Sequence, residues 1–318
     1  MSELTPSIAE NMVKESLFGG YTALKMAGSD TKSILDSRKD IVTNGDIVVG
    51  DAIVDQIKKY GVGFSIYSEE KGKTSIGDNP KYSIIFDDID GTANFNKGDD
   101  MLPYGSIMGV FDREDPSFND CLSAGFLEFN SGNLYMANRG RGAYKIPGFA
   151  GKLDNGQNVE WGKTEMRTSG KTGIMDGLKV LNDQYMLGDI NGAISDSLLK
   201  KGRNNWLNDY GSKAVHIAQI SYGAQDLFVS ANNCNRTDKL FTGEEIGPGY
   251  LIVKEAGGAT MDFNCNDIGN ETIGLGDKKT YDIVMAATEE LGKNFLWRLA
   301  ENEPTIKKYI QSRSRKPS

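Results

Sequence analysis

The stretch Ile84-Ile85-Phe86-Asp87-Asp88-Ile89-Asp90-Gly91-Thr92 decides how this sequence is interpreted. Its short apolar run predicts a buried strand that carries three carboxylates at its carboxyl end. Such carboxylates suit Mg²⁺, which takes oxygen ligands and is usually held by one or two carboxylates together with a substrate phosphate. Gly91 and Thr92, followed by a predicted helix start at residues 93–95, offer backbone N–H groups to a phosphate. The stretch therefore predicts a magnesium and phosphate site at a strand end.

Two further acidic clusters precede this stretch in the chain. Glu69 and Glu70 follow a predicted strand over residues 63–67, and Asp46 closes the segment Asp40–Asp46 just before a predicted helix. A single Asp in a turn usually caps a helix or is solvated. Three clusters that stand beside strands and helices in this order indicate one shared acidic site instead.

The rest of the chain divides into two halves joined by a connection. In the first half, helices are predicted over residues 6–27 and 51–60, and short strands of an antiparallel sheet over 63–67, 82–86, 104–111, 122–129, 134–137 and 142–146. Residues 147–172 are polar and rich in glycine, and they predict the connection. In the second half, strands are predicted over 178–181, 226–229 and 283–287, and helices over 213–222, 244–256 and 289–300. We therefore predict a single unit over residues 1–318, with an α+β half over 1–150 that carries the acidic motifs and an α/β half over 170–300.

Composition and charge exclude several classes of protein. The formal net charge is −8, and the chain has one histidine, His216, and three cysteines without a Cys-x-x-Cys pair. Because nucleic-acid binders usually show a basic domain or stripe, no nucleic-acid partner is expected. Isolated cysteines and one histidine exclude most zinc sites and histidine-based catalysis, and we expect His216 to be a packed or half-exposed helix residue rather than a ligand. No run of about 18 apolar residues predicts a membrane span, and no apolar signal core starts the chain, so we expect a cytoplasmic protein.

The acidic motifs together resemble the inositol monophosphatase superfamily of Mg²⁺-dependent, lithium-sensitive phosphatases. That family combines an acidic pair after a strand, here Glu69-Glu70, with Asp-Pro-(Ile/Leu)-Asp-Gly-Thr-x-Asn-Phe, here residues 87–95 with Asp88 in place of the proline. Its other segments are similar to residues 40–46, 132–144, 210–214 and 255–258, so the likeness covers most of the chain. The resemblance implies an α/β (α+β) fold, the layered αβαβα sandwich of the sugar-phosphatase type, and a homodimer.

The resemblance also implies how the matching residues would hold metal. Glu69, Asp87 and the Ile89 carbonyl would bind a first Mg²⁺. Asp87 would bridge to a second ion, which Asp90 would also hold. Two or three ions are implied in all, with Mn²⁺ as an alternative metal.

Further roles concern catalysis and the substrate. Asp46 and Thr92, with the ligand Glu69, would orient and deprotonate a metal-bound water. The amides of Gly91 and Thr92, beside Asp90, would bind the substrate phosphate. No histidine is required, which suits this chain.

Besides Asp88, two positions depart from the family pattern. The family places a Trp-Asp ten residues before the segment similar to 255–258, and ungapped counting puts Glu245 there as the last metal ligand. Asp238 is the alternative ligand if residues 239–245 are an insertion. Lys213 stands where many relatives carry alanine. It is either a surface residue at a helix start or a substrate-binding residue for a second anionic group, such as the far phosphate of a bisphosphate.

We therefore predict a metal-dependent phosphoric monoester hydrolase that acts on a small-molecule phosphate monoester. The predicted substrate is inositol monophosphate, fructose 1,6-bisphosphate or both, attacked by a metal-activated water. Three alternatives stay open: a 3'-phosphoadenosine 5'-phosphate phosphatase, a catalytically weak protein that binds metal and sugar phosphate, and a haloacid-dehalogenase-type phosphatase. The last would use Asp88 as nucleophile, because residues 88–92 match its Asp-x-Asp-Gly-Thr motif.

Overall fold

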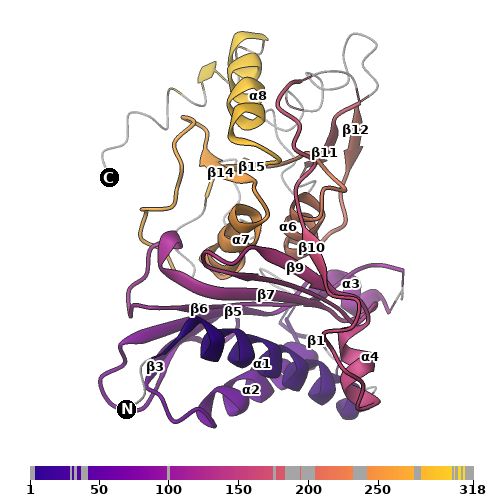
Figure 1. Ribbon diagram of the computed structural model, residues 1–318, viewed down its shortest axis with the longest axis vertical. Coiled ribbons are helices and arrows are strands. Elements are labelled where there is room, and N and C mark those ends of the chain that lie inside the picture. The colour runs from indigo at the N-terminus through magenta and orange to yellow at the C-terminus, as the bar shows by residue number, and fades with distance from the viewer. Residues whose placement is uncertain are drawn as a thin grey trace.

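Helices and sheets alternate in five layers along the long axis of the molecule (Figure 1). Helices α1 (Pro6–Ala27) and α2 (Asn44–Lys58) cover one face of a large sheet. Helices α6 (Lys213–Ser221) and α7 (Gly243–Glu255) lie between this sheet and a smaller one, and α8 (Glu289–Asn302) covers the outer face of the smaller sheet. This arrangement confirms the predicted αβαβα sandwich. The computed structural model describes residues 4–28, 31, 34–36, 42–98, 101–174, 177–182, 194, 205–231, 242–275, 281–302, 304, 307, 308 and 311.

The large sheet has eight strands in the order β10-β9-β8-β7-β6-β5-β3-β4. Neighbouring strands are antiparallel, except that β3 and β5 run parallel with Phe64 opposite Tyr82. The prediction of an antiparallel sheet was therefore wrong at this one pair. The strands are β3 (Phe64–Ser68), β4 (Gly72–Ile76), β5 (Tyr82–Asp90), β6 (Gly105–Phe111), β7 (Cys121–Glu128), β8 (Asn133–Asn138), β9 (Ala143–Ile146) and β10 (Thr164–Met166).

The smaller sheet has five strands in the order β12-β11-β13-β15-β14. It is mixed, because β11 runs parallel to β12 and β13 while β15 runs antiparallel to β13 and β14. Two short strands, β1 and β2, form a separate antiparallel pair. These strands are β1 (Ile34–Asp36), β2 (Val42–Thr43), β11 (Lys179–Asn182), β12 (Trp206–Asn208), β13 (Leu227–Ser230), β14 (Ala259–Asp262) and β15 (Ile283–Ala286).

Helix α4 (Phe149–Asp154) and the 3₁₀ helix over Phe118–Asp120 were not predicted. The other helices agree with the sequence-based predictions to within a few residues, except near residue 44. Helix α2 begins there rather than at residue 51, because Thr43 and Asp46 form a capping box that satisfies backbone N–H groups of the first turn. The helices are α1 (Pro6–Ala27), α2 (Asn44–Lys58), α3 (Thr92–Lys97), α4 (Phe149–Asp154), α6 (Lys213–Ser221), α7 (Gly243–Glu255) and α8 (Glu289–Asn302), with a short 3₁₀ helix η2 (Phe118–Asp120).

The predicted connection over residues 147–172 contains regular structure. Helix α4 and strand β10 both lie within it, and β10 pairs with β9 at the edge of the large sheet. The large sheet therefore extends past residue 150. The division into halves over residues 1–150 and 170–300 stays a prediction.

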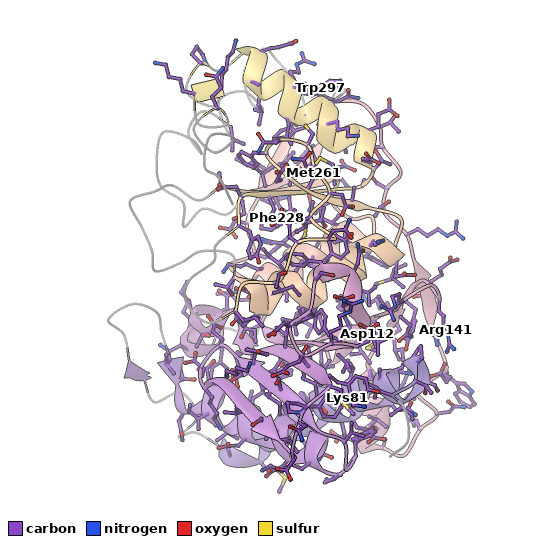
Figure 2. All side chains as sticks on the ribbon, turned by 90° about the vertical axis from the view of Figure 1, so that its left-hand side faces the viewer. Lys81, Asp112, Arg141, Phe228, Met261 and Trp297 are labelled. Carbon is purple, nitrogen blue, oxygen red and sulfur yellow. The ribbon has the colours of Figure 1, made fainter. Side chains whose placement is uncertain are left out.

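Two side chains of the smaller sheet show how the upper layers pack. Phe228 on β13 is buried in the apolar core that α6 and α7 fill between the sheets, whereas Met261 on β14 is buried against α8. Figure 2 shows both in the interior and Trp297 of α8 at the outside, where it is 62% exposed. The sheet thus buries apolar side chains on both faces.

Strand β5 positions the acidic motif because it is buried on both faces. Ile84 and Phe86 belong to the core beneath α1 and α2, and Ile85 belongs to the core beneath α7. Successive side chains of a strand point to opposite faces. The alternation therefore carries Asp87 to the α6–α7 side and Asp88 to the α1–α2 side.

Strand β6 pairs with the acidic end of β5 at Gly105, which lies opposite Asp90. A Cβ atom at Gly105 would stand 2.1 Å from the Leu127 carbonyl oxygen of β7, and this backbone atom has little freedom to yield. We expect Gly105→Ala to lower the free energy of unfolding by about 1–3 kcal/mol or more. Urea denaturation measures this. Gly151→Ala is the control, since no atom lies within 4 Å of a Cβ there, and equal stabilities of the two variants would contradict the prediction.

Candidate active site

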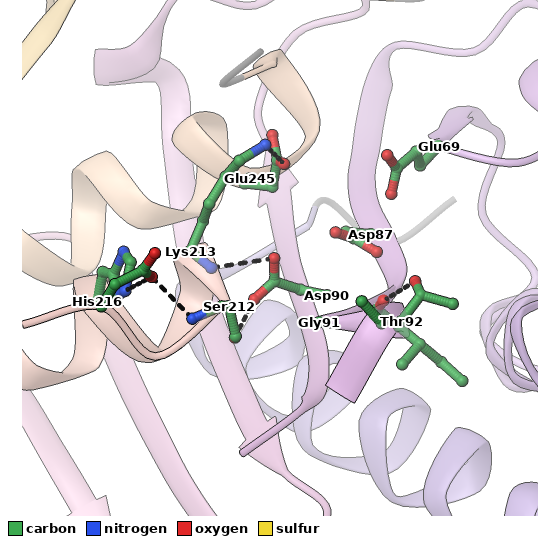
Figure 3. Close-up of a pocket in the computed structure, with 13 residues that line it drawn as sticks. Glu69, Asp87, Asp90, Gly91, Thr92, Ser212, Lys213, His216 and Glu245 are labelled. Carbon is green, nitrogen blue, oxygen red and sulfur yellow. Dashed lines mark hydrogen bonds and ion pairs between the residues drawn. The ribbon is translucent and has the colours of Figure 1, made fainter. Parts of the chain in front are cut away.

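The carboxyl end of β5 meets the first turns of α3, α6 and α7 at one pocket (Figure 3). All predicted metal-binding and substrate-binding residues line it: Glu69, Asp87, Ile89, Asp90, Gly91, Thr92, Lys213 and Glu245. They come from the turn after β3, from β5 and from three helix starts. Asp238, the alternative to Glu245, lies outside the described residues, so the choice between the two stays a prediction.

Three buried carboxylates form the centre of the site. Asp87, Asp90 and Glu245 each offer a carboxylate oxygen, and these atoms all lie within 4.8 Å of one another. Each residue is at most 5% exposed. Like charges this close repel one another strongly where water is excluded. Such a cluster could hold a metal ion.

Asp87 is the least compensated member of the cluster. Its Oδ1 atom is buried and accepts no hydrogen bond among the residues that the structure describes. Burial, reinforced by the charges of Glu69, Asp90 and others nearby, raises the pKa of the Asp87 carboxyl well above its usual range. A buried ionised carboxylate without a partner is costly, and a divalent cation would supply the missing charge. The donor set therefore fits a cation that prefers oxygen ligands.

Asp90, in contrast, is tied to the start of helix α6. Its Oδ1 accepts a hydrogen bond from the Lys213 N–H at 3.2 Å, and its Oδ2 accepts one from the Ala214 N–H at 2.8 Å and another from the Ser212 hydroxyl. A carboxylate is favoured at a helix N-terminus because the unpaired N–H groups carry partial positive charge. Burial, followed by the charge of Glu245, still raises the Asp90 pKa.

Glu245 has partners on both carboxylate oxygens. Oε2 accepts the N–H of Thr242 at 2.8 Å and its hydroxyl at 2.5 Å, which completes the capping box of α7. Oε1 lies 2.7 Å from the Lys213 Nζ atom. Positions 213 and 245, which both depart from the resembled pattern, therefore contact each other. Binding of a second anionic substrate group by Lys213 stays a prediction.

Thr92 lines the pocket, whereas Asp46 does not line it and reaches it only through its contact with Thr92. The Thr92 hydroxyl lies 2.8 Å from the Ile89 carbonyl oxygen and 3.3 Å from Asp46 Oδ1. Asp46 Oδ2 accepts the N–H and hydroxyl of Thr43. Burial raises the Asp46 pKa to about 6, although these hydrogen bonds oppose the shift. Asp46 is thus an acid–base group that ionises near neutral pH.

Asp88 lies on the opposite face of β5 from the pocket. It is fully buried, and a Cβ atom added at Gly50 of α2 would stand 1.9 Å from its Oδ1. Its Oδ2 accepts a hydrogen bond from the Glu70 N–H at 3.4 Å. This placement leaves no room for a substrate at Asp88 and argues against its use as a nucleophile.

Some pocket residues are absent from the set predicted from the sequence. Asp209, Gly211 and Ser212 line the pocket just before α6. Ser212 could have been predicted, because it lies in residues 210–214, which carry part of the family resemblance. His216 lines the pocket as well, yet it is 1% exposed and its Nε2 accepts the Tyr210 N–H at 3.0 Å, as expected of a packed residue.

The comparison with family models decides the family. The model of the inositol monophosphatase family matches residues 7–296. The chain belongs to the inositol monophosphatase family. The predicted resemblance is thereby confirmed, and so is the prediction of a phosphatase at the level of the family.

Curated relatives carry several phosphatase names. A bifunctional NADP phosphatase/NAD kinase of Methanococcus maripaludis is 27% identical over 233 residues, which are 70% of this chain and 37% of that protein. The chain thus matches little more than a third of this relative. A fructose-1,6-bisphosphatase/inositol-1-monophosphatase of Methanothermobacter thermautotrophicus is 26% identical over 250 residues, 76% of this chain and 77% of that protein.

Solved structures of the family share the fold. The IMPase of Thermotoga maritima superposes with a TM-score of 0.67 at 19% sequence identity, and the alignment covers 94% of this chain and 98% of that one. This likeness bears out the inositol monophosphatase fold. Among the described residues, no helix has the length and apolar character needed to cross a membrane.

The raised pKa of Asp46 predicts a pH dependence of stability in the metal-free chain. The folded chain holds this proton up to about pH 6, whereas an unfolded chain releases it near pH 4. Because the folded state then binds more protons, its stability falls as the pH rises from about 4 to about 6. Asp46→Asn is uncharged and nearly isosteric. We therefore expect the free energy of unfolding of this variant to fall less than that of wild type over this pH range, by up to about 3 kcal/mol.

The measurement is urea denaturation at pH 4.5 and 7.5 with chelator present. Wild type and Asp46→Asn are compared at both pH values. Asp55→Asn is the control, since Asp55 on the outer side of α2 is exposed. If wild type and Asp46→Asn lose the same stability between pH 4.5 and 7.5, the prediction that folding raises the pKa of Asp46 is wrong.

Proposed function

We propose that this chain is a Mg²⁺-dependent phosphomonoesterase whose substrate is inositol monophosphate, fructose 1,6-bisphosphate or both. The observation that carries the proposal is the buried, uncompensated carboxylate of Asp87 within a family of phosphatases. The name of the Methanothermobacter relative, a protein matched over most of both chains, supports this choice of substrate. A small phosphate monoester suits this pocket, because a bound cation would offset the negative charge of both the phosphate and the acidic side chains.

We propose Glu69, Asp87 and the Ile89 carbonyl as the residues that hold the cation. All three residues line the pocket, and Asp87 Oδ1 accepts no competing hydrogen bond among the described residues. A divalent ion bound there would lower the pKa of a water molecule and offset the negative charge of the phosphoryl group during transfer. Mn²⁺ has similar ligand preferences and is the alternative metal.

Asp46 and Thr92 are proposed to move the proton. Asp46 is ionised above about pH 6, so its Oδ1 can accept the hydrogen of the Thr92 hydroxyl 3.3 Å away. The Thr92 oxygen then becomes an acceptor that can orient a water molecule and take up its proton. The relay ends on the buried Asp46 carboxylate, which is ionised before the step at neutral pH and is neutralised when it takes up the proton.

The start of helix α3 is proposed to hold the phosphate. Gly91 precedes the helix with φ of 88°, a left-handed conformation that suits glycine. The same residue approaches Ser212, Pro103 and Tyr104 closely, since a Cβ atom there would lie 3.1–3.2 Å from them. The N–H groups of Gly91 and Thr92 would therefore meet the phosphate on a rigid, crowded turn.

An NADP phosphatase activity is a second candidate. The similarity to the bifunctional Methanococcus protein favours it, although that match covers only 37% of the relative. A 3'-phosphoadenosine 5'-phosphate phosphatase and a catalytically weak sugar-phosphate binder remain alternatives. The homodimer and the cytoplasmic location likewise remain predictions.

Phosphate release tests the proposal and separates these candidates. The substrates are inositol 1-phosphate, fructose 1,6-bisphosphate, NADP and 3'-phosphoadenosine 5'-phosphate, each with Mg²⁺ and with chelator. We expect Mg²⁺-dependent release from inositol 1-phosphate or fructose 1,6-bisphosphate. Asp87→Asn should lower this release roughly 100-fold or more, because even partners one step removed from a metal cost 10–100-fold when mutated.

Asp88→Asn is the matched control. It changes the neighbouring buried aspartate, which faces α2 and not the pocket. We expect it to keep its activity, whereas the nucleophile alternative requires complete loss. If the substrates stabilise the protein but none releases phosphate, the proposed phosphatase activity is wrong, and the alternative of a sugar-phosphate binding protein is favoured.

A further inference from the structure

The acidic cluster is compensated unevenly. On one side, Asp87 Oδ1 accepts no hydrogen bond among the described residues. On the other side, both oxygens of Asp90 and both oxygens of Glu245 already have donors from helix starts or side chains. A cation is therefore needed at Asp87 far more than at Glu245.

Lys213 joins the two compensated carboxylates. Its backbone N–H donates to Asp90 Oδ1 at 3.2 Å, and its Nζ atom lies 2.7 Å from Glu245 Oε1. Figure 3 shows its side chain extended from the Asp90 end of the pocket toward Glu245. The Glu245 side chain is 3% exposed and that of Lys213 is 20% exposed, so solvent screens this ion pair only weakly.

An ammonium and a divalent cation compete for the same lone pairs. Glu245 Oε2 is engaged by the N–H and hydroxyl of Thr242, which leaves Oε1 as the oxygen open to a cation, and Oε1 holds Lys213. Lys213 occupies the first turn of α6, whose N–H groups donate to Asp90, so the helix fixes its backbone position. The positive charge is thus built into the chain at this side of the cluster.

We propose that the Lys213 ammonium takes the place of a divalent cation on the Glu245 side of the cluster, so that the chain binds one divalent ion fewer than it would without this lysine. The proposal rests on the proposed function in that it treats the cluster as a metal site. It assigns the remaining ion to the side of Glu69 and Asp87. Glu245 then serves as the partner of Lys213 and not as a metal ligand in wild type.

Counting bound Mn²⁺ tests the proposal without reference to activity. Free Mn²⁺ is measured by electron paramagnetic resonance while the ion is titrated into metal-free protein. Lys213→Met removes the charge and keeps the length of the side chain, and Lys213→Gln keeps a hydrogen-bond donor in case the methionine variant does not fold. We expect both variants to bind one more Mn²⁺ per chain than wild type, and Lys213→Arg to bind the wild-type number.

Lys171→Met is the matched control. Lys171 also pairs with a buried carboxylate, Asp226 at 2.8 Å, but it lies outside the pocket. We expect this variant to bind the wild-type number of ions.

The outcomes separate the two proposals. Binding of the same non-zero number of Mn²⁺ by wild type, Lys213→Met and Lys213→Gln would overturn the role of Lys213 and leave the metal site intact. Binding of none by any of them would overturn the metal site itself and the proposed function with it. An extra ion in Lys171→Met as well would also overturn the assignment to Lys213.

Discussion

Repulsion among buried carboxylates is the constraint on which the rest of the site depends. Asp87, Asp90 and Glu245 bring oxygens within 4.8 Å of one another where solvent is nearly excluded. Water screens such charges poorly there, so the fold must offset them with its own donors or with a cation. Strand β5 holds the aspartates in these buried positions, because it is buried on both faces and ends at the pocket.

The middle layer of helices supplies most of the compensation. Helix α6 directs its first N–H groups at Asp90, and α7 holds Glu245 in its capping box. These helices pack between the two sheets, so the residues that balance the charge come from the second half of the chain while β5 comes from the first. The pocket is therefore a product of the layered architecture. Of the three clustered carboxylates, Asp87 is the one whose Oδ1 has no hydrogen-bond donor among the described residues, which leaves it to an external cation.

The sequence predicted the elements with strong local signals and missed those without them. Helix α1 was predicted with its observed bounds, because its apolar residues recur at helical spacing. Strand β4, with the polar sequence Gly72–Ile76, has no apolar alternation and was not predicted. The parallel pairing of β3 with β5 was also missed, because the order of two strands along the chain does not determine whether they pair parallel or antiparallel. The acidic motif was identified because its residues are adjacent in sequence, whereas the contact between Lys213 and Glu245 depends on how α6 and α7 pack.

A crystal structure of the wild-type chain soaked in Mn²⁺ tests the central claim most directly. An anomalous difference map locates the ion without any assumption about substrate or activity. We predict a peak within bonding distance of the Asp87 carboxylate, on the side of Glu69. A fully soaked crystal with no anomalous peak at Asp87 would contradict the claim that this buried carboxylate is compensated by a divalent cation.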